Sequence, residues 1–219
     1  MLLEQERIDV VNYCKKLITA GLTTGTGGNI SILNREKGLY AMSPSGMDYF
    51  ETQPEDVVVM DLDGNVVDGK RKPSSEHALH RIFYTDRDDL DAIVHTHSTY
   101  CTVIATLREP LPASNYLIAF AGPEIRCGEY ASYGTPELAK ATFEAMKDRQ
   151  AALMANHGMV AGARTIAGAF NIADQIEQCA KVYVLARAIG KPVILDEDEM
   201  ERMMVRFRDD YGQKNMKKA

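Results

Sequence analysis

The apolar positions of the chain follow two different periods, which together predict a protein built from strands and helices. Short apolar runs, typical of buried strands, stand at 57–60, 92–97 and 151–155. Longer segments with apolar residues every three or four positions, typical of amphipathic helices, cover 3–20 and 165–189. The remaining expected elements are strands at 30–32, 39–42, 66–67, 117–120 and 125–127, and helices at 74–84, 98–107, from 135 onward and at 196–208. This order favours one α/β domain over residues 1–219.

Composition narrows the class of protein. The chain has 219 residues, of which 45% are hydrophobic and 26% charged, as is ordinary for a globular protein. A net charge of −6 argues against a nucleic-acid-binding surface, which needs basic excess. No stretch approaches the roughly 18 apolar residues of a membrane span, and the charged N-terminus is unlike a signal peptide. Four scattered cysteines without a C-x-x-C pair favour free thiols and a cytoplasmic location.

Three histidines follow two of the predicted strands. The 92–97 run ends in His95-Thr96-His97, and side chains two residues apart in a strand point to the same face. His157 follows the 151–155 run and precedes a glycine, which allows close approach of the backbone. A single histidine is more often an ordinary buried residue, but the three together favour a shared metal site. Neutral imidazoles suit zinc first and then other divalent first-row metals.

A glutamate precedes the three histidines in the sequence, at the predicted start of the 74–84 helix. Glu76 would close a tetrahedral site with the three histidines, and a closed site is structural. A catalytic site therefore requires that Glu76 leave when substrate arrives, after which it becomes a base beside a Lewis acid. The alternative is an ordinary glutamate at a helix start. His77 and His80, on the same helix, are interpreted as surface or packing residues.

Three short segments offer groups that bind anions. Glycines in 25–29 allow successive N–H groups to point inward, as phosphate-binding loops do. Ser45-Gly46 offers a hydroxyl and an amide, and Ser74-Ser75 precede a predicted helix, whose N-terminus favours phosphate. Each segment alone is weak evidence for anion binding, because such residues usually form turns or cap helices. Their conjunction with a metal site favours a phosphorylated substrate.

The combination of motifs resembles a known family. The motifs in order are Gly-Gly-Asn-Ile-Ser (27–31), Ser-Pro-Ser-Gly (43–46), Pro-Ser-Ser-Glu (73–76), Val-His-Thr-His-Ser (94–98), Asn-His-Gly (156–158) and Tyr-Gly (211–212). This pattern is similar to the class II aldolase/adducin family, and most like its members that cleave L-fuculose 1-phosphate or 5-deoxypentulose 1-phosphates. The resemblance implies a three-layer α/β/α domain around a mostly antiparallel sheet, assembled as a homotetramer with its sites at subunit interfaces.

The resemblance also implies a role for individual residues. It assigns zinc to His95, His97 and His157, with Glu76 as exchangeable ligand and base. The residues that it assigns to the substrate phosphate are Thr26, Gly28, Asn29, Ser45, Gly46, Ser74 and Ser75. It assigns proton donation at a neighbouring subunit's site to Tyr116, and positions near the aldehyde to Tyr133 and Tyr211. The chain departs from the family at Tyr133, where phenylalanine is usual, and at Asn115, where histidine is expected.

The activity implied is reversible cleavage of a ketose 1-phosphate to dihydroxyacetone phosphate and a short aldehyde such as lactaldehyde or acetaldehyde. Two other enzymes of the family remain as alternatives. A pentulose-5-phosphate 4-epimerase typically has aspartate in place of Glu76, whereas a methylthioribulose-1-phosphate dehydratase shares the glutamate. The non-enzymatic alternative is an adducin-like interaction module, which has no need for the three histidines.

Overall fold

A computed structural model describes residues 1–209 of the chain. Eight strands form one sheet, in the order β4-β3-β2-β1-β5-β8-β7-β6. Their bounds are β1 (Asn29–Asn34), β2 (Leu39–Met42), β3 (Val58–Asp61), β4 (Val66–Asp68), β5 (Ala92–Thr96), β6 (Cys127–Gly128), β7 (Ala151–Met154) and β8 (Gly158–Ala163). All neighbours pair antiparallel except β6 and β7, so the expectation of a mostly antiparallel sheet is confirmed.

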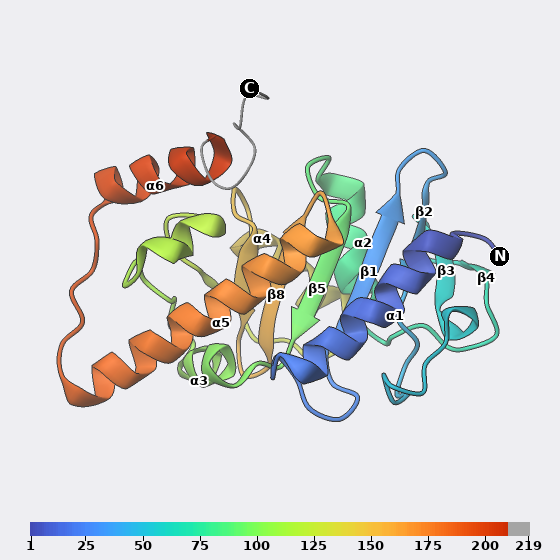
Figure 1. The fold of residues 1–219 in the computed structure, drawn as a ribbon, viewed down its shortest axis with the longest axis horizontal. Coiled ribbons are helices and arrows are strands. Elements are labelled where there is room, and N and C mark those ends of the chain that lie inside the picture. The colour runs from blue at the N-terminus through green and yellow to red at the C-terminus, as the bar shows by residue number, and fades with distance from the viewer. Residues whose placement is uncertain (210–219) are drawn as a thin grey trace, which may run out of the picture.

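Helices cover both faces of this sheet (Figure 1). They are α1 (Glu4–Thr19), α2 (His77–Asp86), α3 (Thr99–Leu107), α4 (Pro136–Ala145), α5 (Ile166–Ile189) and α6 (Glu197–Asp209), with short 3-10 helices η1 (Pro54–Asp56) and η2 (Tyr116–Phe120). One hydrophobic cluster joins α1, α3 and α5 to one face of the sheet, and a second joins α2 and α4 to the other. The three-layer α/β/α arrangement expected from the sequence is therefore confirmed.

Strand β5 lies near the middle of the sheet and is buried along its whole length. Val94 packs into the cluster of α1, α3 and α5, whereas Ile93 packs into the cluster of α2 and α4. A strand covered on both faces reads as a continuous apolar run rather than an alternating one, which is why the sequence identified it. Burial on both sides also gives the histidines at its end a rigid support.

Two parts of the predicted secondary structure were wrong. Residues 117–120 form the 3-10 helix η2 and not a strand, because the Asn115 side chain accepts a hydrogen bond from the Leu117 amide (3.0 Å) and so starts a helical turn. Strand β8 was not predicted, since glycine and alanine dominate it and both are poor strand formers. Its small residues are needed there: a Cβ on Gly162 would lie 2.8 Å from the Ile93 side chain.

Two further expectations concern single residue types. The four cysteines are free, as predicted from their spacing. His80, interpreted as a surface or packing residue, is fully buried, so the surface alternative was wrong. Among the helices that the structure describes, none combines the length and apolarity needed to cross a membrane.

Arg7 of α1 ties the N-terminal segment to the edge of the sheet. Its buried guanidinium donates from Nε to the Leu2 carbonyl (2.8 Å) and from Nη1 to the Val57 carbonyl (2.5 Å). Nη2 lies 2.6 Å from the carboxylate of Asp68, a residue whose side chain is 46% exposed. The backbone acceptors need this donor, because buried carbonyls without a partner are costly.

We expect Arg7→Met to lower the free energy of unfolding by about 2–4 kcal/mol, since two carbonyls lose their donor. Asp68→Asn is the matched control and should cost at most about 1 kcal/mol, because Asp68 is half-exposed and screened by solvent. Urea denaturation of both variants measures the difference. Equal losses would mean that the ion pair, and not the backbone acceptors, determines the contribution of Arg7.

Candidate active site

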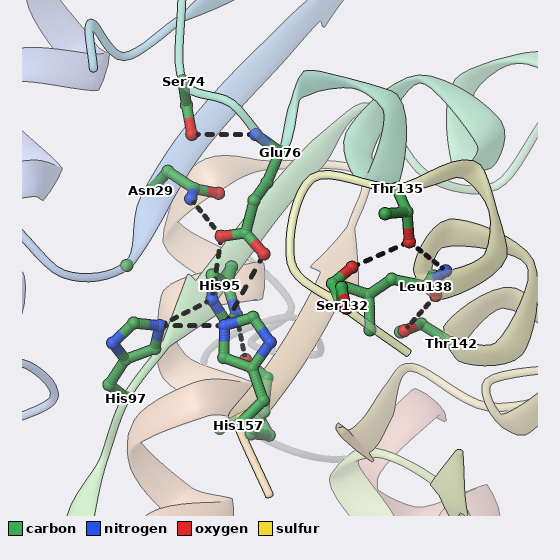
Figure 2. A network of polar contacts seen from close by, with 12 residues as sticks. Asn29, Ser74, Glu76, His95, His97, Ser132, Thr135, Leu138, Thr142 and His157 are labelled. Carbon is green, nitrogen blue, oxygen red and sulfur yellow. Dashed lines mark hydrogen bonds and ion pairs between the residues drawn. The ribbon is translucent and has the colours of Figure 1, made fainter. Parts of the chain in front are cut away.

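Four side chains converge beside the end of β5 (Figure 2). The ligand atoms of Glu76, His95, His97 and His157 all lie within 4.8 Å of one another. Nε2 of His97 lies 3.0 Å from Nε2 of His95 and 3.1 Å from Nε2 of His157. The carboxylate lies 3.3 Å from Nε2 of His95 and 3.6 Å from Nε2 of His157. The structure thus brings together the three histidines and Glu76 that the sequence predicts as metal ligands.

The four residues come from three separate segments. His95 is the penultimate residue of β5 and His97 follows the strand. Glu76 precedes α2, and His157 lies in the turn between β7 and β8. That turn needs its flanking residues: Asn156 has a left-handed backbone (φ 54), and a Cβ on Gly158 would lie 2.2 Å from the Thr96 carbonyl oxygen. Glycine at position 158 therefore lets the turn approach β5 closely enough to bring His157 to the other two rings.

The charges of the three rings favour metal binding. Nδ1 of His95 lies 3.0 Å from the Met159 carbonyl, so it donates its proton there and Nε2 faces the cluster as an acceptor. Burial and repulsion from His95 and His157 hold the pKa of His97 at about 4. Burial and repulsion from His95 likewise hold the pKa of His157 at about 4. Both rings are therefore neutral at pH 7, with lone pairs available.

Glu76 supplies the negative charge of the cluster. Burial raises the pKa of its carboxyl, but interactions with His95, His157 and Asn29 outweigh burial and lower it well below the usual range. Burial lowers the pKa of His95, but Glu76 outweighs burial there and raises it. The ionised carboxylate of Glu76 and the His95 ring therefore stabilise each other.

The cluster fits a divalent cation. The Oε1 atom of Glu76 is buried and has no hydrogen-bond partner among the described residues. In a tetrahedral site with metal–nitrogen bonds of about 2.0–2.1 Å, ligand nitrogens lie roughly 3.3 Å apart. The spacings of 3.0 and 3.1 Å between ring nitrogens are close to this value. Three imidazoles and one carboxylate are also a donor set that zinc and its neighbours prefer.

A cavity of about 420 Å³ opens beside the cluster. It is lined by Thr26, Gly27, Gly28, Asn29, Pro44, Ser45, Gly46, Ser74, Ser75, Glu76, His97, Tyr130, Ala131, Tyr133, Asn156 and His157. All seven residues expected at a substrate phosphate are in this lining, although they come from three distant segments of the chain. The cavity therefore joins the candidate anion-binding groups to the candidate metal ligands.

Backbone hydrogen bonds join two of the anion-binding segments, and a tyrosine side chain holds the third. The Ser74 amide donates to the Ser43 carbonyl (3.0 Å), and the Ser45 amide donates to the Lys72 carbonyl (2.9 Å). The glycine loop is fixed from outside by Tyr49, whose hydroxyl lies 2.7 Å from the Gly28 carbonyl. Gly28 itself has φ +71, and a Cβ there would lie 2.7 Å from the His95 carbonyl oxygen. The loop is thus packed directly against the end of β5.

Asn29 makes contacts that sequence reasoning missed. Its Nδ2 donates to Oε2 of Glu76 (2.9 Å), and its Oδ1 lies 2.5 Å from Nε2 of His80. Both ends of the amide are therefore engaged inside the protein. Sequence reasoning assigned Asn29 to the phosphate alone and gave His80 no role, although the four-residue spacing from Glu76 to His80 places both on one side of α2.

The tyrosines predicted to act near the aldehyde do not all lie at the cavity of this chain. Tyr133 lines the cavity and is 73% exposed. Tyr116 lies at the start of η2, is half-exposed, and stacks against Phe207 of α6 with ring centroids 6.1 Å apart. It is not part of this chain's cavity lining. Tyr211 lies outside the described residues.

Comparisons of the sequence and of the structure with known proteins point to the same family over most of the chain. Residues 8–184 match the family described as class II aldolase and adducin N-terminal domain. The chain is 56% identical over 213 residues to 5-deoxy-D-ribulose 1-phosphate aldolase of Bacillus thuringiensis serovar kurstaki, covering 97% of this chain and 100% of that protein. It is 40% identical to 5-methylthioribulose-1-phosphate/5-deoxyribulose-1-phosphate aldolase of Rhodospirillum rubrum, covering 94% of this chain and 92% of that protein. A solved structure of an L-fuculose 1-phosphate aldolase has TM-score 0.93 and 53% identity, covering 95% of this chain and 98% of that one.

We expect His97→Ala to reduce bound divalent metal well below one ion per chain, because the His97 ring nitrogen contacts both other rings. His77→Ala is the matched control, since His77 lies outside the cluster, and it should retain full metal content. Elemental analysis of both purified variants provides the measurement. Full occupancy in His97→Ala would refute a shared metal site.

Proposed function

The chain belongs to the class II aldolase and adducin family, and from that membership we propose that it is a metal-dependent ketose-1-phosphate aldolase. The observation that carries the proposal is the cluster of Glu76, His95, His97 and His157 in the wall of a cavity with three anion-binding segments. Such an enzyme is a lyase. It breaks one carbon–carbon bond of its substrate and re-forms it in the reverse direction.

The proposed substrate is L-fuculose 1-phosphate or a 5-deoxypentulose 1-phosphate. Cleavage of the C3–C4 bond gives dihydroxyacetone phosphate and a short aldehyde, lactaldehyde from the first substrate and acetaldehyde from the second. Relatives at 56% and 40% identity are both named as 5-deoxyribulose-1-phosphate aldolases, which favours the second. All ketoses of this class share the phosphate-bearing half that the cavity would hold.

The proposed cofactor is one zinc ion per subunit, held by His95, His97 and His157 together with Glu76. When bound, the ion supplies a Lewis acid that stabilises negative charge on the substrate's carbonyl and neighbouring hydroxyl oxygens. The residues proposed to bind the substrate phosphate are Thr26, Gly28, Asn29, Ser45, Gly46, Ser74 and Ser75. Their amides and hydroxyls bind an anion without any net positive charge on the protein.

Glu76 is the proposed base. In the synthetic direction it removes a proton from the hydroxymethyl carbon of dihydroxyacetone phosphate, and in cleavage it returns that proton. Its low pKa keeps the carboxylate ionised at neutral pH. Asn29 donates a hydrogen bond to one carboxylate oxygen, whereas the other has no hydrogen-bond partner among the described residues and lies 3.6 Å from Nε2 of His157. This second oxygen, which accepts no hydrogen bond from those residues, is the one that would accept the proton.

Tyr116 is the proposed acid that protonates the aldehyde oxygen in synthesis. Because it is half-exposed and absent from its own chain's cavity lining, we propose that it serves the site of a neighbouring subunit in a homotetramer. Tyr211 is proposed to lie near the aldehyde, although it falls outside the described residues. The unit that assembles would be one domain spanning residues 1–219.

We expect Tyr116→Phe to reduce cleavage by ~10²–10⁴-fold, the range that general acid catalysis contributes, while metal content stays normal. The substitution keeps the ring that stacks on Phe207 and removes only the hydroxyl. Tyr13→Phe is the matched control and should leave the rate unchanged, because Tyr13 packs edge-on against Phe170 and does not line the cavity. Wild-type rates in Tyr116→Phe would assign protonation to another group.

We expect Glu76→Gln to abolish exchange of a carbon-bound proton of dihydroxyacetone phosphate with heavy water in the absence of aldehyde. Glutamine keeps the size of the side chain but is no longer a base. NMR of deuterium uptake makes the measurement, with Glu137→Gln at the exposed start of α4 as the matched control. Unchanged uptake in Glu76→Gln would remove Glu76 from the base role, and no uptake by the zinc-loaded wild type would overturn the aldolase itself.

Product analysis of the wild type separates the proposed reaction from the two related ones. An epimerase would equilibrate a pentulose 5-phosphate and release no aldehyde. A dehydratase would remove water and leave the carbon chain intact. An adducin-like module would do neither and would bind no metal at His95, His97 and His157.

A further inference from the structure

A line of buried polar side chains runs from Glu76 into the interior between α2 and β1. Asn29 joins Glu76 to His80, as described above. Nδ1 of His80 lies 2.7 Å from the hydroxyl of Ser31, which in turn lies 2.5 Å from the hydroxyl of Tyr84. His80 and Ser31 are fully buried, Tyr84 is 2% exposed and Asn29 is 4% exposed. The line is therefore sealed from water everywhere except at its Glu76 end.

The line has a simple geometric basis. Glu76, His80 and Tyr84 follow one another at four-residue steps along α2, and Asn29 and Ser31 stand two residues apart on one face of β1. Four residues of helix rise about 6 Å, and two residues of strand advance about 6.6 Å. Because these steps nearly match, side chains of the helix and the strand alternate along the line.

Hydrogen-bond chemistry gives the line one direction. Glu76 is ionised and only accepts, so the Asn29 amide must present Nδ2 to it and Oδ1 to His80. The reverse orientation would place two acceptor oxygens 2.9 Å apart. His80 must then carry its proton on Nε2 and accept on Nδ1 from the Ser31 hydroxyl, which accepts from Tyr84. Every donor in the line therefore points toward the Glu76 carboxylate.

The His80 ring is suited to donate a hydrogen bond to Asn29. Burial holds the pKa of His80 at about 3, so the ring is neutral at pH 7 and has one N–H that can donate a hydrogen bond. Hydrogen bonds at both ring nitrogens fix the orientation of the ring and therefore the direction of its N–H. A series of aligned hydrogen bonds also polarises its members, which strengthens the last bond in the series, from Asn29 to Glu76.

Resting on the proposed function, we propose that His80 is a positioning residue for the base: its Nε2–H locks the Asn29 amide so that Nδ2 holds one oxygen of Glu76 and directs the other toward substrate. Without this lock the amide could turn, and its oxygen would repel the carboxylate. Asn29 is then a link between the phosphate-binding loop and the base, and not only a phosphate ligand.

The first test reads the proton on His80 without any assay of activity. Long-range ¹H–¹⁵N NMR of the wild type, assigned through the backbone, distinguishes a ring protonated at Nε2 from one protonated at Nδ1. We expect the Nε2–H form at neutral pH in both the metal-free and the zinc-loaded protein. A ring protonated at Nδ1, or at both nitrogens, would overturn the proposal, and this result needs no variant that must fold.

The second test compares two amides at position 80 in the zinc-loaded enzyme. The amide nitrogen of His80→Gln reaches the place of Nε2 and keeps the donor, whereas that of His80→Asn reaches only the place of Nδ1. We expect His80→Asn to lower kcat by roughly 10–100-fold, as loss of outer hydrogen-bond partners does at metal sites, with KM and metal content unchanged. We expect His80→Gln to restore kcat to near the wild-type value.

Phe83→Leu is the matched control for packing, because Phe83 is buried on the same helix and lies outside the line. It should lower Tm and leave kcat unchanged. Equal losses of kcat in His80→Gln and His80→Asn, or a similar loss in Phe83→Leu, would show a purely structural role and overturn the proposal. Failure of the proposed function is distinguishable, because the wild type would then cleave no ketose 1-phosphate whatever form His80 takes.

Discussion

The constraint on which the rest of the structure depends is the meeting of three imidazole nitrogens and one carboxylate within 4.8 Å. The Glu76 carboxylate and the His95 ring favour each other's charged forms, which lowers the pKa of the first and raises the pKa of the second. Holding the cluster requires rigid supports on every side. The central strand β5, the close turn at Gly158 and the start of α2 supply them.

The same supports place the phosphate-binding candidates. Gly28 packs against the His95 carbonyl and the next residue, Asn29, pairs with His95 between β1 and β5, so the glycine loop is held beside the proposed metal ligands. The Ser74 amide is bonded to Ser43, which joins the remaining two segments to the strand beside β1. The proposed phosphate site and the proposed metal site are thus held against one another by the same strands, as the proposed reaction, which depends on positioning, requires.

Predictions of structure from the sequence were confirmed where a single local pattern was sufficient. His95 and His97 stand two apart at the end of a run that is apolar because both faces of β5 are covered. They failed where local preference and tertiary need disagree. The β8 strand is poor in strand-forming residues because Ile93 leaves no room at Gly162, and the apolar residues after Asn115 turn into a 3-10 helix through a side-chain cap.

The sequence by itself determined the chemistry available: three imidazoles, a carboxylate, glycine loops and serines, in an order that identifies the family. Only the tertiary structure decided how these groups are connected, because hydrogen-bond partners such as Asn29 and His80 lie 51 positions apart in the chain. Their pairing follows from the matching rise of α2 and β1, which exists only once the helix lies on the strand. The four-residue spacing places His80 on the same side of α2 as Glu76, but only its contact with Asn29 distinguishes it from an ordinary packing residue.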